Sequence, residues 1–139
     1  MVTQKAVYDW STEHEKLHPY YTGVLSYEDL SMLNQLPKVH LSASASASLG
    51  AGGQNIRVQI HNPSNNLAFQ IHLTVVDQKS GDEILPVLWE DNYFSLVPGE
   101  SRAVVAHYDS PPKAGHLRLE IGGWNIDARA TVVEGAMPN

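Results

Sequence analysis

The 139-residue chain has a formal charge of −6, its Lys and Arg residues are scattered singly, and it contains no cysteine. Its length suits one domain that buries roughly two thirds of its unfolded surface. The negative charge argues against nucleic acid as a partner, and the lack of a long apolar run argues against a membrane. The missing thiols exclude disulfides and cysteine chemistry.

The N-terminal segment, residues 1–36, is rich in aromatic side chains but shows no sustained hydrophobic period. Its stretch SYEDLSMLNQL predicts one short helix over 27–34, because Ser26 can cap it and Leu30 and Leu33 share a face. The proline that follows ends this helix. We interpret the segment as a lead-in that packs against another structure, since it is too short and irregular for a domain.

From residue 37 to 135 the hydrophobic period is two, which is the period of half-buried strands. Turn clusters of Gly, Pro, Asn and Ser separate these runs at spacings of about 8 to 12 residues. The predicted strands are 39–48, 55–62, 68–77, 83–89, 92–96, 101–108, 116–121 and 126–133. Seven to eight short strands with almost no helix are typical of an antiparallel β-sandwich, here followed by a tail at 136–139.

Two of these runs carry more detailed expectations. The alternation in 68–77 points its larger apolar residues inward, and these are Phe69, Ile71, Leu73 and Val75. Pro86 predicts that 83–89 is an edge or bulged strand, because proline has no backbone N–H to donate to a neighbouring strand. The Ala/Ser tract could also be low-complexity sequence, but its alternation favours a strand with a small-residue face.

No metal, nucleophile or phosphate site emerges from the sequence. Four of the seven histidines, His40, His61, His72 and His116, fall on the polar phase of their strands, and none shows HxH or HExxH spacing. The serines lack a GxSxG elbow, and the glycine stretches GAGG and IGGWN connect strands rather than a strand and a helix. We therefore predict no cofactor.

Exposed aromatic residues raise the alternative of carbohydrate binding. Trp10, Trp89 and Trp124 could stack on sugar rings. The competing interpretation, which we favour, is that Trp89 and Trp124 are buried in the core or at a sheet edge, as tryptophans of β-sandwiches usually are.

The adjacent acids Glu90 and Asp91 suggest a glycosidase at first sight. Neighbours on an extended strand point to opposite faces, however, so the two cannot flank one glycosidic bond with both carboxyls facing it. The Asp-Asn and Pro-Gly pairs of this stretch are turn formers. They predict a short strand between two turns, with Tyr93 or Phe94 buried.

Three stretches of the chain resemble one enzyme family. LPVLWEDNYFSLVPGES (85–101) resembles the signature of the last β-sandwich domain of family 2 glycoside hydrolases of the exo-β-glucosaminidase and β-mannosidase type. IGGWN (121–125) resembles the turn before the final strand of that domain, and 21–46 resembles its linker and first strand. The signature residues are Trp89, Asp91, Asn92, Tyr93, Pro98, Gly99, Glu100, Trp124 and Asn125.

The resemblance implies an immunoglobulin-like accessory domain whose partners are the catalytic barrel and neighbouring domains of a glycosidase. A barrel takes about 250 residues, so this chain lacks the two catalytic glutamates and no catalytic residue is carried over. Residues 1–36 would be the linker from the barrel, and their exposed aromatics would favour a weak homodimer. A secreted or periplasmic parent is favoured. The rival functions are a carbohydrate-binding module and a free-standing interaction domain.

Overall fold

The computed structural model describes residues 7–9, 23–26, 28–50, 52–109 and 116–135. The chain divides into two compact units, 1–35 and 36–139, and each is described by itself. The aromatic residues Trp10, Tyr20 and Tyr21 of the predicted linker lie outside the described residues.

The first unit contains a small sheet that the sequence did not predict. Strand β1 (Val7–Asp9) pairs antiparallel with β2 (Gly23–Ser26). Because the two strands are only 3 and 4 residues long, no hydrophobic period of useful length marks them in the sequence.

The expected helix over 27–34 is a 3-10 helix, η1 (Ser31–Gln35). Asp29 sets its start, since the Asp29 Oδ1 atom accepts a hydrogen bond from the Ser31 N–H at 2.9 Å. Ser26, the cap expected from sequence, instead ends β2. Hydrogen bonding from the Ser31 side chain, and then from the Ser31 N–H, lowers the pKa of the Asp29 carboxyl.

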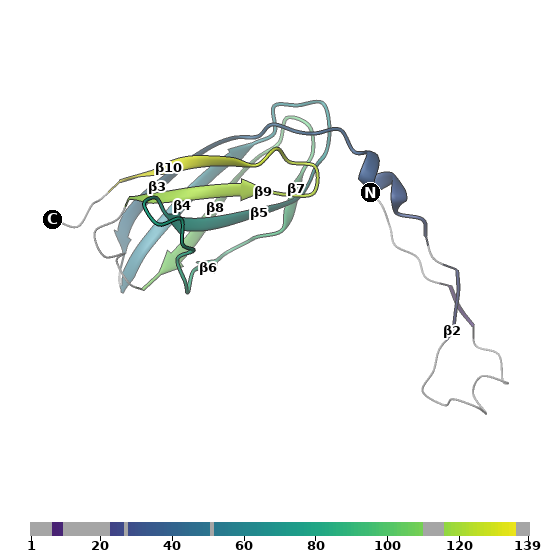
Figure 1. Cartoon of the computed structure of the whole chain (residues 1–139), viewed down its shortest axis with the longest axis horizontal. Helices are drawn as coiled ribbons and strands as arrows, with labels where there is room; N and C mark the ends of the chain where they lie inside the picture. Colours follow the sequence, from purple (N-terminus) through teal and green to yellow (C-terminus); the bar gives the residue numbers. More distant parts are fainter. Residues whose placement is uncertain (1–6, 10–22, 27, 51, 110–115, 136–139) are drawn as a thin grey trace. The chain divides into compact units, whose positions relative to one another are not determined.

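The second unit is an all-β sandwich, which confirms the predicted fold class. Its strands are β3 (Ser42–Gly50), β4 (Gly53–His61), β5 (Ala68–Asp77), β6 (Leu88–Trp89), β7 (Phe94–Leu96), β8 (Ser101–Tyr108), β9 (Leu117–Gly122) and β10 (Arg129–Gly135). They form one curled sheet in the order β6-β8-β4-β3-β10-β9-β5-β7 (Figure 1). In this order, β6, β8, β4 and β3 make one layer, and β10, β9, β5 and β7 make the other. This arrangement is found in immunoglobulin-like sandwiches.

The two layers join through the first and last strands of the unit. Strand β10 pairs antiparallel with β9 and parallel with β3, and the parallel register sets Val133 opposite Ala45. An isolated parallel bridge between Val39 and Ile126 extends the same seam. Among the described strands of the sandwich, the other pairings are antiparallel.

Alternating residues from both layers form a single hydrophobic core. Strands β4, β5, β8 and β9 bury every second residue over most of their length, as a period of two requires. The largest fully buried apolar side chains are Ile56, Ile60, Ile71, Leu96, Leu119 and Ile121. The small face of β3 contributes Ala45, while Ala43 and Ala47 are only partly buried.

A bulge in β5 corrects one detail of the predicted core. The register between β5 and β7 shifts between Ala68 and Ile71, and Gln70 has a φ of 54°. The bulge changes the phase of the strand at its start, so Ala68 is fully buried and Phe69 is only half-buried. Ile71, Leu73 and Val75 point inward as expected.

The two edge strands are shorter than the sequence suggests. Strand β6 has two residues, and Pro86 precedes it, in keeping with its place at an edge. Strand β7 begins at Phe94 rather than at residue 92. Its Phe94 is buried, whereas Tyr93 is 67% exposed.

Candidate functional site

The candidate site begins with Asn92, which joins the 85–101 stretch to β5. Its side-chain amide accepts a hydrogen bond from the Leu73 N–H at 2.9 Å and donates one to the Leu73 carbonyl at 3.0 Å. It thus occupies both backbone groups that Leu73 would offer to a neighbouring strand. The same Oδ1 atom accepts the Tyr93 N–H at 3.0 Å, which fixes the backbone from which the Tyr93 ring projects.

Asn125 joins the GGWN turn to β5 through side-chain hydrogen bonds, as Asn92 joins the 85–101 stretch to it. Its side chain is 2% exposed, and its Oδ1 atom accepts the Phe69 N–H at 2.9 Å. Its Nδ2 atom donates to the carbonyls of Pro37 and Leu67 at 2.7 and 2.8 Å. The Trp124 N–H donates to the Phe69 carbonyl at 3.0 Å, so the turn is bound to β5 at both residues.

The two glycines of this turn permit the close approach. A Cβ atom on Gly122 would lie 2.6 Å from Cε1 of His72, and one on Gly123 would lie 2.5 Å from a side-chain carbon of Ile126 and 3.0 Å from the Gln70 carbonyl oxygen. A side chain at Gly123 would therefore displace Ile126 or the Gln70 backbone, whereas one at Gly122 would require the His72 ring to move. The sequence predicts a tight connection at GGWN, and the family resemblance adds Trp124 and Asn125 as signature residues of this turn.

These contacts create a shallow aromatic hollow of about 510 Å³. Its walls are Phe69, Gln70, His72, Tyr93, Gly123 and Trp124. The Tyr93 and His72 rings stack with centroids 5.8 Å apart and planes 24° apart. Two sequence motifs that lie far apart in the chain thus supply the exposed rings of one surface.

Backbone strain is concentrated at the same hollow. Among the described residues, Gln70 and Tyr93 are the non-glycine positions with positive φ, at 54° and 59°, and both line the hollow. Left-handed backbone is sterically unfavourable for such residues and persists only where neighbouring contacts hold it. The Asn92 contacts supply that restraint at Tyr93.

The three tryptophans that the sequence offered as sugar-stacking candidates differ in their exposure and in whether the structure describes them. Trp124 is 52% exposed at the hollow, so the expectation that it is buried is wrong. Trp89 is half-buried against the core and pairs with Ala106 at the edge of the sheet, as the favoured interpretation required. Trp10 lies outside the described residues.

The adjacent acids do not form a catalytic pair. Asp91 is bound to Arg102 at 3.0 Å, and Glu100 lies 3.5 Å from the same guanidinium group. The Arg102 guanidinium carbon lies 4.8 Å from the centre of the Phe94 ring. Glu90 is exposed and makes a ladder contact through its backbone N–H to the Val105 carbonyl at 2.9 Å.

The Pro98–Gly99 step forms the second turn of this stretch. The Glu100 N–H donates to the Val97 carbonyl at 3.1 Å across it, and Gly99 has a φ of 75°, as the third position of a type II turn requires. The Glu100 carboxylate accepts the Val97 N–H at 2.9 Å and so closes the turn from outside.

Asn62 is a third structural asparagine, which the sequence pattern places at the end of the predicted strand 55–62. It is fully buried and donates to the carbonyls of Asn66, Leu96 and Val97. Its Oδ1 atom accepts from the N–H and hydroxyl of Ser64. The only sequence signal is the Asn-Pro step, which indicates a turn but not a buried side chain.

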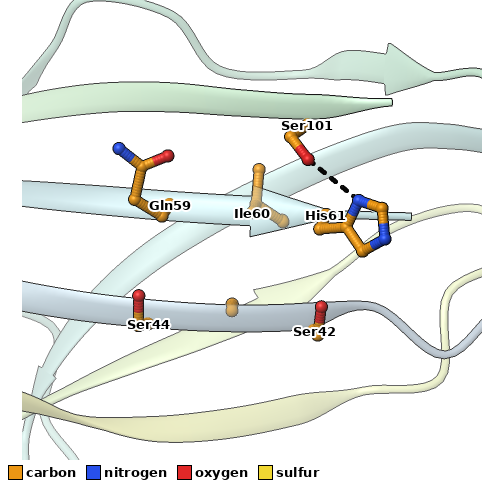
Figure 2. Close-up of a pocket in the computed structure, with 7 residues that line it drawn as sticks. Ser42, Ser44, Gln59, Ile60, His61 and Ser101 are labelled. Carbon is orange, nitrogen blue, oxygen red and sulfur yellow. Dashed lines mark hydrogen bonds between the residues drawn. The ribbon is translucent and has the colours of Figure 1, made fainter. Parts of the chain in front are cut away.

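A polar groove lies on the outer face of the opposite layer (Figure 2). Figure 2 shows His61 and Ser101 facing each other from β4 and β8, with His61 Nδ1 2.9 Å from Ser101 Oγ. In the described part of the chain no carboxylate pairs with His61, so nothing orients the imidazole as a general base would require. Ser42, Ser44 and Gln59 complete the groove.

Titratable groups contribute structure rather than chemistry. Burial raises the pKa of the Tyr108 phenol, which donates a 2.6 Å hydrogen bond to Gln54 in the core. The backbone amides of Ser80 and Lys79 lower the pKa of the carboxyl of Asp77, the last residue of β5. Over the described ranges, no three metal-ligating side chains gather into a metal site, and no helix could span a membrane.

Comparison with known proteins gives consistent similarities. The family model described as the exo-beta-D-glucosaminidase Ig-fold domain matches residues 19–126. The chain is 36% identical over 110 residues to an exo-beta-D-glucosaminidase of Arthroderma benhamiae, and this match covers 79% of the chain and 12% of the relative. A mannosylglycoprotein endo-beta-mannosidase of Lilium longiflorum is 31% identical over 93 residues, which are 62% of the chain and 10% of the relative.

A solved structure agrees with these sequence relatives. The Amycolatopsis orientalis exo-chitosanase CsxA superimposes with a TM-score of 0.79 at 32% identity. The match covers 94% of this chain and 15% of that one. The chain therefore spans only a small part, 10% to 15%, of these proteins that it resembles.

Proposed function

Because the chain belongs to the family of exo-β-D-glucosaminidase Ig-fold domains, we propose that it is a non-catalytic β-sandwich domain of a larger glycoside hydrolase. The family match over residues 19–126 carries this proposal, together with the small share of each relative that the chain covers. The remaining length of those relatives is ample for a separate catalytic barrel. The substrate of the whole enzyme would be a β-linked glucosamine or mannose glycan.

The carboxylates support a non-catalytic role. A retaining glycosidase needs two carboxyl groups about 5 to 5.5 Å apart on either side of one glycosidic bond. Here Asp91 and Glu100 share Arg102, and Glu120 is bound to Arg118 at 2.6 Å. Each of these carboxylates forms an ion pair with an arginine side chain, an arrangement that supports a structural role for them.

Exposed aliphatic residues support packing against a neighbouring domain. Leu85 and Leu88 are 72% and 68% exposed; Leu85 precedes the short edge strand β6 and Leu88 is its first residue. Leucines that are this exposed at a sheet edge promote aggregation unless another surface covers them. A neighbouring domain packed on this edge would shield them from solvent. We assign this edge as the face that contacts the catalytic domain.

A hydrolysis assay on the purified 139-residue chain tests the proposal. With aryl β-glucosaminide and aryl β-mannoside substrates, product release should equal that of buffer alone, while a complete exo-β-glucosaminidase serves as the positive control. Turnover that copurifies with the chain through several columns would refute the non-catalytic role.

A further inference from the structure

We propose that the aromatic hollow of Phe69, Gln70, His72, Tyr93, Gly123 and Trp124 binds a sugar ring of a β-linked glucosamine oligosaccharide. The inference rests on the proposed function for the glycan class, and on the geometry of the hollow for the site itself. It gives this domain a role in holding substrate in addition to its role as a scaffold.

The exposure of the two large rings is built into the backbone. Tyr93 and Trp124 are 67% and 52% exposed, although Phe94 beside Tyr93 is buried. Tyr93 is held outward by left-handed backbone and the Asn92 side chain, and Trp124 by its bond to Phe69 and the buried Asn125. Strain that is maintained to keep an aromatic ring in solvent is typical of a preorganised binding surface.

The hollow has the size and the mixture of groups that a pyranose ring needs. Its volume of about 510 Å³ lies within the usual range of small-molecule sites. Tyr93 and Trp124 offer flat apolar faces for the C–H face of a sugar, while His72 and Gln70 supply polar groups for its hydroxyl rim. A second hollow of about 320 Å³ shares His72 and includes Thr74, Glu120 and Arg129, which gives room for a second ring.

The charge favours an amino sugar over a neutral one. No Lys or Arg is among the six residues that line the hollow, and the whole chain carries a formal charge of −6. A protonated amine is attracted to the faces of Tyr and Trp rings and to the negative field of the domain. Protein docking would instead favour an aliphatic surface, and that is found at Leu85 and Leu88.

The test is an NMR titration of the 15N-labelled chain with the β-1,4-linked glucosamine disaccharide. Backbone amide signals of Gln70, Tyr93, Gly123 and Trp124 should shift together in a saturable way. Gln59, in the polar groove of the other layer, should not move and is the internal control. The N-acetylated disaccharide is the neutral matched ligand and should bind more weakly.

Ring variants connect the shifts to the hollow. Tyr93→Ala and Trp124→Ala should each weaken binding about tenfold, because each removes one stacking face. Leu88→Ala, at an equally exposed leucine outside the hollow, should leave the affinity unchanged. Tyr93→Gly removes the ring without backbone strain, so it tests binding in a chain that remains folded, as a thermal melt would verify.

Several results would overturn the proposal. These are the absence of saturable shifts at millimolar disaccharide, equal affinity for the acetylated sugar, and unchanged affinity in both ring variants. Shifts at the hollow caused by a separately expressed catalytic domain but not by sugar would identify a docking surface instead. A negative titration would refute sugar binding but would not change the result of the hydrolysis assay. The two proposals are therefore tested independently.

Discussion

At the scale of single residues, the left-handed conformations of Gln70 and Tyr93 have the clearest consequences. Gln70 follows Phe69, which is bound by the Asn125 side chain, and the backbone N–H of Tyr93 is bound by the Asn92 side chain. Both Gln70 and Tyr93 line the aromatic hollow. Left-handed backbone costs a non-glycine residue about 1–2 kcal/mol, so two such positions lower the stability of the domain measurably. Stability given up at one surface is a common accompaniment of function.

Replacing Gln70 by glycine should therefore stabilise the domain. We expect Gln70→Gly to raise the free energy of unfolding by about 0.5–1 kcal/mol, since relief of the left-handed strain exceeds the entropy cost of glycine. Gln59→Gly, at an exposed position of β4 without positive φ, should lower it by a similar amount. Urea denaturation measures both, and equal losses in the two variants would contradict the strain argument.

At the scale of elements, asparagine side chains supplement the strand ladders that hold the first half of β5. Asn92 and Asn125 contact β5 on either side of the Gln70 bulge, and each replaces backbone pairing that the bulge interrupts. Alternation in the sequence predicted the strands because a period of two is a property of neighbouring residues. The bulge and the asparagine contacts escaped prediction because they depend on partners about 20 to 60 residues away.

Removing Asn125 should cost far more stability than removing Asp91. Asn125→Ala breaks three hydrogen bonds and leaves the Phe69 N–H without its acceptor, which should lower the free energy of unfolding by about 2–4 kcal/mol. Asp91→Ala removes a partly exposed ion pair with Arg102 and should cost less than about 1 kcal/mol. Thermal melts of the two variants compare them directly, and equal losses would refute the assigned role of Asn125.

At the scale of the whole molecule, two layers close over one core, and the resemblance to a family was more informative than the strand pattern. The pattern indicates a sandwich, but neither the strand order nor the parallel β3–β10 pairing can be read from it. The site was predicted in part. Tyr93 and Trp124 were recognised as signature residues. The alternation of 68–77 placed Gln70 and His72 only on the outward face of the strand, because their position in the hollow comes from the packing of two distant turns.

Alkaline pH should destabilise the whole domain through Tyr108. Burial raises the pKa of its phenol in the folded state, so above the ordinary tyrosine pKa of about 10 the unfolded chain loses this proton first. Fewer bound protons in the unfolded state make the stability fall as pH rises, while the contribution is complete below that value. Denaturation midpoints measured across this range should fall less steeply in Tyr108→Phe, and an identical slope would contradict the assignment.

The parallel seam between β3 and β10 also has a mechanical meaning. Residues 45–47 of β3 pair with 133–135 of β10, and the two strands run in the same direction. Tension along the polypeptide pulls β3 back toward its start and β10 forward toward its end, so the strands are drawn past each other. The hydrogen bonds of the seam then bear the load together instead of opening one at a time. A domain with this seam would resist tension applied at its two ends without unravelling.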